Sequence, residues 1–213
     1  MHYLTDSIAF PPVHESEQDG LLAMGGDLSV KRLLLAYRSG IFPWFEEGQP
    51  ILWWSPELRM VLKPAEIKIS KSFRKTIRTH PYEIRYNTAF ADVMNFCATM
   101  PRKGQLGTWI TEDMQMAYQR MHALGHAHSV EVWQDDELVG GLYGIDLPEK
   151  RIFCGESMFS RVTDASKIAF YHLAKSLEAK HYQLIDCQMY TSHLESLGGY
   201  EMPREDFLRY LYS

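Results

Sequence analysis

The chain has 213 residues, of which 46% are hydrophobic and 23% are charged, and its formal net charge is −5. This length allows one substantial hydrophobic core, or one core with a small additional domain. The negative charge argues against a protein that coats nucleic acid nonspecifically, because such proteins are usually basic.

The sequence has no pattern typical of export or membrane insertion. Its N-terminus lacks a basic segment followed by an apolar one, and no apolar run reaches the roughly 18 to 20 residues that span a bilayer. The three cysteines, Cys97, Cys154 and Cys187, are far apart and form no Cys-x-x-Cys pair. We therefore expect a cytoplasmic protein with buried, reduced thiols and no membrane contact.

The first 62 residues are predicted to form a small N-terminal domain. They are rich in Pro, Gly and Trp, and they contain one convincing helix, which begins at the Asp27-Leu28-Ser29 cap and ends at Gly40. The dipeptide Lys63-Pro64 is followed by longer amphipathic patterns. We therefore divide the chain into residues 1–62 and 63–213.

A basic amphipathic helix is predicted from Ser70. Ile69, Phe73 and Ile77 share one face at i, i+4 spacing. The segment 68–78 holds five cations and no carboxylate, although the whole chain is acidic. The cations that project from the other faces of this helix are Lys71, Arg74, Lys75 and Arg78.

The remaining elements are predicted in an α+β order. Two helices run from Thr88 to Met100 and from a Thr111 cap to Gly125. An antiparallel hairpin (129–133 and 138–145), a third strand (151–159), a helix capped by Asp164 and a strand (183–189) follow. This order predicts a mainly antiparallel central sheet flanked by helices.

Polar residues interrupt two of the apolar strands. Asp186 and Gln188 are two residues apart in a strand and so share one face. A buried aspartate needs a partner, because burying it alone costs several kcal/mol. This pair therefore indicates either a site or a core aspartate satisfied by backbone or a cation. Glu156 follows Gly155, which allows close approach of a ligand, but it could equally face solvent on an edge strand.

Three histidines invite a metal interpretation that the context does not favour. His122 and His126 have i, i+4 ligand spacing, and His128 follows. Gly125 is expected to end the helix between them, and no Glu-containing zinc motif accompanies them. We expect neither a metal site nor a cofactor.

Ordered segments throughout the chain resemble the leucyl/phenylalanyl-tRNA-protein transferase family. Those in the first third are residues 20–29 (GLLAMGGDLS), 40–45 (GIFPWF) and 51–56 (ILWWSP). Those in the remainder are 107–110 (GTWI), 124–133 (LGHAHSVEVW), 138–144 (LVGGLYG), 154–161 (CGESMFSR), 165–167 (ASK) and 185–188 (IDCQ). The resemblance spans nearly the whole chain, with two departures: Gly199 stands where the family usually has Ala, and the chain ends at Ser213, earlier than many members.

The resemblance implies an activity and a fold. It implies transfer of Leu, Phe or Met from aminoacyl-tRNA to proteins whose N-terminal residue is Lys or Arg, which marks them for degradation. It also implies a small N-terminal domain joined to a GNAT-type acyltransferase domain. We expect a monomer, because the sequence has no evident heptad or dimerisation pattern.

The resemblance also implies roles for individual residues. An apolar pocket for the donor side chain matches Leu142, Phe153, Met158, Phe170 and Ile185, although these could be ordinary core residues. Stacking on the terminal adenosine matches Trp44, Trp109 and Tyr118. The four cations of the basic helix would bind acceptor-stem phosphates.

The transfer reaction that the resemblance implies requires only modest catalysis. Aminoacyl-tRNA is an activated ester, so an amine must be positioned and one proton managed. Because an α-amino group has a pKa of about 7.7 to 8.0, a weak base suffices. We expect Asp186, oriented through Gln188, to accept or relay this proton. Glu156 would bind the amino group or the cationic side chain of the acceptor.

Two other classes of function remain open. An acyl-coenzyme-A-dependent GNAT acetyltransferase would share the order of elements, but residues 159–167 hold no glycine where that class places its pyrophosphate loop. A noncatalytic tRNA-binding module would explain the basic helix, but it gives no reason for Glu156 and Asp186 within apolar strands.

Overall fold

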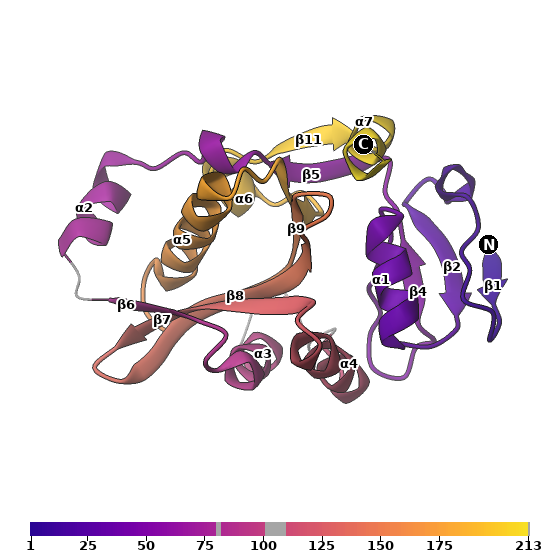
Figure 1. Cartoon of the computed structure of the whole chain (residues 1–213), viewed down its shortest axis with the longest axis horizontal. Helices are drawn as coiled ribbons and strands as arrows, with labels where there is room; N and C mark the ends of the chain where they lie inside the picture. The colour runs from indigo at the N-terminus through magenta and orange to yellow at the C-terminus, as the bar shows by residue number, and fades with distance from the viewer. Residues whose placement is uncertain (80–81, 101–109, 213) are drawn as a thin grey trace.

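The computed structural model describes residues 1–79, 82–100 and 110–212. Over these residues the chain forms a small sheet near the N-terminus and a larger sheet that follows it (Figure 1). No helix in these ranges is both long enough and apolar enough to cross a membrane. The chain is thus a mixed α+β protein with a small N-terminal part, which confirms the predicted class.

The N-terminal sheet has four strands in the order β1-β2-β4-β3 among the described residues, and α1 packs beside it (Figure 1). Strands β1 and β2 are parallel, and the other two pairs are antiparallel. The bounds are β1 His2–Leu4, β2 Leu21–Gly25, α1 Val30–Arg38, β3 Phe42–Pro43 and β4 Leu52–Trp54, with a 3-10 turn at Val13–Glu15.

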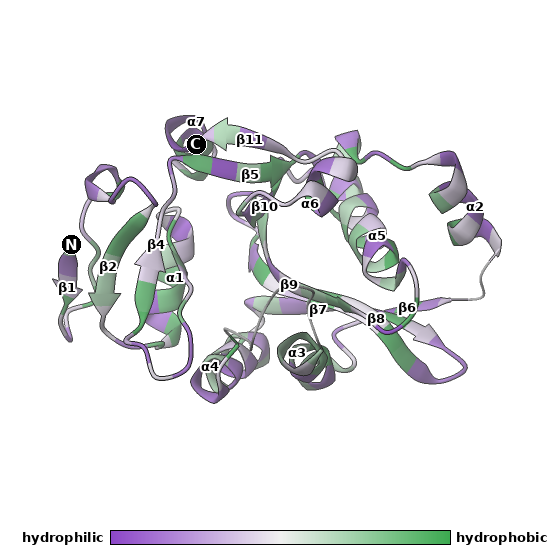
Figure 2. Cartoon of the chain, turned by 180° about the vertical axis from the view of Figure 1, so that it is seen from behind, coloured by the Kyte–Doolittle hydropathy of each residue, from purple (hydrophilic) through white to green (hydrophobic). Residues whose placement is uncertain are grey.

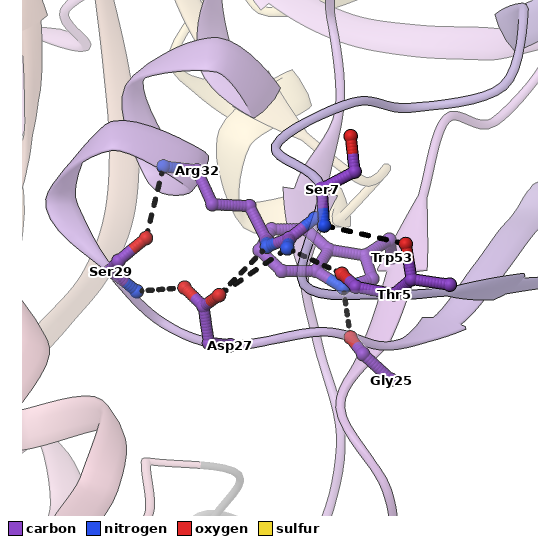
Figure 3. Close-up of polar contacts among 7 residues, drawn as sticks. All are labelled: Thr5, Ser7, Gly25, Asp27, Ser29, Arg32 and Trp53. Carbon is purple, nitrogen blue, oxygen red and sulfur yellow. Dashed lines mark hydrogen bonds and ion pairs between the residues drawn. The ribbon is translucent and has the colours of Figure 1, made fainter.

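A buried arginine links the first helix to the segment that follows the first strand (Figure 3). Arg32 is fully buried, donates from Nη2 to the carbonyl oxygen of Thr5 at 2.8 Å, and pairs with the Asp27 carboxylate at 3.3 Å. Asp27 also accepts from the backbone N–H of Ser29 at 2.7 Å. The Ser29 hydroxyl in turn caps α1, as the sequence predicted.

The larger sheet has seven strands in the order β11-β5-β10-β9-β8-β7-β6 within the described ranges. Strands β9 and β10 are parallel, and every other neighbouring pair is antiparallel, so the sheet is mainly antiparallel as predicted. The bounds are β5 Leu58–Leu62, β6 Glu83–Tyr86, β7 Ala127–Gln134, β8 Glu137–Leu147, β9 Ile152–Ser160, β10 Leu184–Gln188 and β11 Tyr200–Pro203.

Helices cover both faces of this sheet (Figure 1). Helices α3 and α4 lie on one face and α5 lies on the other, whereas α2 lies at the end remote from the N-terminal sheet and is largely hydrophilic (Figure 2). The bounds are α2 Lys71–Thr79, α3 Phe90–Thr99, α4 Glu112–Ala123, α5 Ala165–Ala179, α6 Ser192–Ser196 and α7 Arg204–Tyr212, with a 3-10 turn at Pro64–Glu66.

Alternate residues of the larger sheet point to opposite faces and pack into two hydrophobic cores. Tyr143 on β8 packs with α3 and α4, in a core that continues into the N-terminal sheet through Trp53. Its neighbour Leu142 faces the opposite way and packs with α5. The N-terminal sheet and the larger sheet therefore share one continuous core.

The pairing of residues 58–62 bears on where the boundary between the two parts lies. Residues 58–62 were expected in the N-terminal domain, but as β5 they pair with β10 and β11 in the larger sheet. The dipeptide Lys63-Pro64 therefore follows a strand of the larger sheet. We propose a division before Leu58.

Candidate active site

A cavity of about 930 Å³ lies between the N-terminal sheet and the larger sheet. Its walls come from β3, β8, β9, α5, the end of β10 and the segment after it, and α6. The pairing of β9 with β10 ends at Cys154 and Asp186, although β9 continues to Ser160. The two parallel strands therefore separate beside the cavity, and polar groups from both can face it.

Glu156 on β9 lines the cavity and is the centre of a polar network. Its Oε1 accepts from Nε2 of Gln188 at 2.7 Å, and its Oε2 accepts from the Tyr118 hydroxyl at 3.1 Å. The Tyr118 hydroxyl is also hydrogen bonded to that of Tyr37, on α1. Burial raises the pKa of Glu156 to about 7, although the hydrogen bonds from Tyr37, Tyr118 and Gln188 favour the ionised form.

Asp186 does not line the cavity but lies behind it, fully buried against Arg59. The Arg59 Nε donates to Oδ1 at 2.8 Å and Nη2 donates to Oδ2 at 2.7 Å, which is a bidentate pair. Oδ1 also accepts the backbone N–H of Gln188 at 2.9 Å. The shared face predicted for Asp186 and Gln188 is interrupted, because the register shifts between them and Gln188 has a φ of 63°.

The residues predicted to form the donor pocket divide into two groups. Leu142, Met158 and Phe170 line the cavity. Phe153 and Ile185 belong to the core between the sheet and α5, where they are 2% and 0% exposed. These two residues therefore support the wall of the cavity rather than face it.

The three predicted stacking aromatics have different locations. Trp44 lines the cavity and is 39% exposed, so part of its side chain is accessible there. Tyr118 is fully buried, with its ring edge against Tyr143 and its hydroxyl on Glu156. Its ring has no face open to a base, and its place is in the Glu156 network. Trp109 lies outside the described residues.

The basic helix forms as α2, and its charged side chains are solvent-exposed. Phe73 is buried and packs edge-on against Tyr171 of α5. Lys71, Arg74, Lys75 and Arg78 are exposed, and none of them forms an ion pair with another described residue. That these four residues bind phosphates stays a prediction.

His122 and His128 contact other protein groups. His122 stacks on Phe90 with ring centroids 4.1 Å apart, and its Nδ1 bonds to the Ala127 carbonyl oxygen at 2.7 Å. His128 lies next to Asn87 and Asp146. Within the described ranges, no group of His, Cys, Asp and Glu side chains is arranged to hold a metal ion.

Sequence reasoning missed two residues of the site, Arg59 and Tyr37. Arg59 interrupts the apolar strand Leu58–Leu62, and this is the counterpart of Asp186 interrupting Leu184–Gln188. Two opposite charges in two apolar strands are a pairing signal. Tyr37 has no comparable signal, because an aromatic residue on the buried face of a helix is ordinary core.

The cavity and its polar network have the form of an enzyme active site. Such a site can bind an apolar side chain of a substrate in the cavity and hold a polar reacting group of the substrate beside it. A carboxyl group with a pKa near 7 can hold an amine and exchange a proton with it at neutral pH. The Cys187 thiol at the cavity is not activated as a nucleophile, because burial strongly raises its pKa.

Comparison with known proteins identifies the family. Residues 61–212 match the leucyl/phenylalanyl-tRNA protein transferase family, and residues 26–57 match the N-terminal domain of that family. A leucyl/phenylalanyl-tRNA–protein transferase of Flavobacterium psychrophilum is 54% identical over 99% of both chains. One from Flavobacterium johnsoniae is 55% identical over 100% of both chains.

The chain belongs to the leucyl/phenylalanyl-tRNA protein transferase family, which confirms the resemblance seen in the sequence. Likeness among solved structures is much weaker. The structure of L-PGS from Bacillus licheniformis is 9% identical, with a TM-score of 0.42, over 80% of this chain and 53% of its own. A likeness at this level carries no argument about function.

Proposed function

We propose that the chain transfers Leu, Phe or Met from aminoacyl-tRNA to the N-terminal Lys or Arg of acceptor proteins. We place this activity in the cytoplasm, in a monomer, as a step that marks the acceptor for degradation. Family membership supports the reaction class. The observation that carries the proposal is Glu156, a carboxyl group with a pKa near 7 at the edge of an apolar cavity.

The cavity suits the side chain of the donor amino acid. Leu142, Met158 and Phe170 provide an apolar lining without charge. Burying an apolar side chain there contributes about 1.5 to 3 kcal/mol. Shape selects among apolar donors weakly, since one methylene discriminates by about 1 to 3 kcal/mol. A pocket of this kind fits several related donors, in agreement with the Leu, Phe and Met expected for the family.

Glu156 is suited to the amine of the acceptor. A glutamate with an ordinary pKa is a poor proton acceptor for an ammonium group with a pKa of about 7.7 to 8.0. Raising the Glu156 pKa to about 7 nearly matches the two groups. The unfavourable free energy of proton transfer then falls to about 1.4 kcal/mol, which corresponds to one pKa unit. We propose that Glu156 binds the acceptor amino group and takes up its proton as the amine attacks the ester.

Asp186 then has a different role from the proton acceptor expected from the sequence. Its carboxylate already accepts two hydrogen bonds from Arg59 and one from the Gln188 backbone, and its side chain is 1% exposed. Both of its oxygens are engaged in these bonds, and Asp186 does not line the cavity, so it does not face the amine of an acceptor. We propose that Asp186 positions Gln188, and that Gln188 orients Glu156 through its amide.

The tRNA would reach the site from the exposed side of the cavity. Trp44 offers an aromatic face at the cavity, which suits stacking of a terminal base, worth about 1 to 3 kcal/mol. The exposed cations of α2 suit phosphates of the acceptor stem. Such contacts predict binding that depends on salt and is indifferent to the sequence of the tRNA body.

We also propose that the larger sheet and its helices are a GNAT-type acyltransferase domain. The observations in favour are the mainly antiparallel sheet, the helices on both faces, and the separation of β9 from β10 beside the cavity. An acyl-coenzyme-A donor fits less well. The connection between β9 and α5 contains no glycine, and Ser160 Oγ already accepts the backbone N–H of Ser166 there at 2.7 Å.

A transfer assay tests the proposal. Labelled leucyl-tRNA is mixed with the protein and a peptide that begins with Arg, and label in the peptide is measured. A matched peptide that begins with Glu is the acceptor control, and labelled acetyl-coenzyme A is the donor control. We expect label only from leucyl-tRNA and only in the Arg peptide. Acetylation of either peptide without leucine transfer would contradict the proposal.

A further inference from the structure

We infer that Arg59 is a positioning residue for the reaction: it fixes Asp186, and through Asp186 it holds the Gln188 backbone so that the Gln188 amide meets Glu156. This inference rests on the proposed function. It assigns a role to a strand residue that lies outside the cavity and cannot touch either substrate.

The first step is the pair between Arg59 and Asp186. Both side chains are almost completely buried, at 2% and 1% exposure, and the two N–H groups of Arg59 bind both oxygens of Asp186 at 2.8 and 2.7 Å. This fork fixes the plane of the carboxylate as well as its position. A lysine keeps the charge but has no second in-plane donor, so it cannot fix that plane.

The second step is the backbone of Gln188. Oδ1 of Asp186 accepts the Gln188 N–H at 2.9 Å, beside the register shift in β10. Gln188 has a φ of 63°, in the left-handed region that L side chains rarely adopt, so its backbone needs an external restraint. With that restraint, Nε2 of Gln188 lies 2.7 Å from Oε1 of Glu156.

Arg59 also contacts the small N-terminal part. Its Nη1 donates to the Gly40 carbonyl oxygen at 3.3 Å, and its guanidinium lies 4.6 Å from the centre of the Phe42 ring. Phe42 and Gln188 both line the cavity. One guanidinium therefore contacts the N-terminal part directly and the Gln188 backbone through Asp186.

A double-mutant cycle in single-turnover transfer separates positioning from general stability. Arg59→Lys should lower the rate about 10- to 100-fold in the wild-type background, because a small displacement near the reacting atoms has an effect of that size. In a Gln188→Ala background the same change should lower the rate by less than about twofold, because independent effects add and shared ones do not. Equal losses in both backgrounds would overturn the inference.

The controls exclude loss of binding and loss of fold. The affinity for leucyl-tRNA should stay within about twofold, since Arg59 does not reach the cavity. Arg38→Lys is the matched variant, because Arg38 forms an exposed ion pair with Glu149 at 2.8 Å and touches neither Asp186 nor Gln188. It should leave the rate unchanged. If Arg59→Lys does not fold, Asp186→Asn breaks the same pair from the other side and enters the same cycle.

A measurement without turnover separates this inference from the proposed activity. Hydrogen exchange of the Gln188 backbone amide, followed by ¹⁵N-resolved NMR, should speed up at least about tenfold in Arg59→Lys and not in Arg38→Lys. Unchanged exchange would overturn the role of Arg59 even if transfer is lost. If the wild-type protein transfers no amino acid, the proposed function is wrong. The hydrogen-exchange rate of the Gln188 amide still shows whether Arg59 fixes the Gln188 backbone.

Discussion

Replacing Glu156 with Gln isolates the contribution of its carboxyl group. The variant keeps the size of the side chain and an oxygen that can accept from Gln188 or Tyr118, but it can neither take up a proton nor pair with an ammonium by charge. General base catalysis contributes about 10²- to 10⁴-fold. Because the acceptor amine is already partly neutral near pH 7, we expect the lower end, a loss of about 100-fold in single-turnover transfer.

The pH dependence of the rate is the sharper signature of this carboxyl group. The wild-type rate should rise as the pH passes about 7, where Glu156 loses its proton. A further rise is expected near 7.7 to 8.0, where the acceptor amine becomes neutral. Glu156→Gln should lose the first rise and keep the second. An unchanged rate, or an unchanged lower inflection, would refute the reasoning.

The same carboxyl group makes a prediction about stability. Its pKa in the folded protein, about 7, is above the ordinary value of 4.5, so the folded state favours the protonated form. That contribution to stability is fully present below pH 4.5 and is lost as the pH rises through about 7. At pH 8, Glu156→Gln should therefore be more stable than the wild type, by up to about 3 kcal/mol in urea unfolding. Glu149→Gln, at an exposed glutamate, is the control and should show no such gain.

Three further predictions concern the cavity, the basic helix and the N-terminal core. Phe170→Ala enlarges the cavity and should shift the ratio of Leu to Phe transfer toward Phe by about tenfold. The ratio is measured with both donors in competition. An unchanged ratio would mean that Phe170 does not line the donor pocket. Replacing Lys71, Arg74, Lys75 and Arg78 with Ala should make a plot of log affinity for tRNA against log salt concentration less steep, by about 3 in slope. The transfer rate at saturating tRNA should not change. An unchanged slope would mean that tRNA does not bind at this helix. Arg32→Met should lower the free energy of unfolding by about 1 to 3 kcal/mol. The substitution removes a buried hydrogen bond to the Thr5 carbonyl oxygen, and it leaves half-exposed Asp27 without its ion-pair partner. Equal urea midpoints for variant and wild type would contradict this.

Elements with a clear period were predictable from the sequence. The Thr111 cap begins α4 and Gly125 follows its end, as the local signals required. The meander of β7, β8 and β9 follows the alternating strands closely. The strands of the N-terminal sheet were not predicted, because segments as short as Phe42–Pro43 have no measurable alternation. They depend on packing around Trp53, which is fully buried.

The residues of the site were easier to predict than their arrangement. Asp186 and Glu156 are conspicuous as carboxylates within apolar strands, and both lie at or behind the cavity. The partner of Asp186 is 127 residues away in the sequence, and the link between Tyr37 and Tyr118 spans 81 residues. No local pattern encodes such pairs. The left-handed turn at Gln188 also has no sequence signal, because glycine is the usual residue there.

Transfer by Glu156→Gln across the pH range tests the central claim most directly. The wild-type chain should move leucine from leucyl-tRNA to a peptide that begins with Arg, with a lower inflection in the single-turnover rate near pH 7. The variant should bind leucyl-tRNA equally well, transfer about 100-fold more slowly, and lack that inflection. A variant that transfers as fast as the wild type, with the same inflection, would contradict the account.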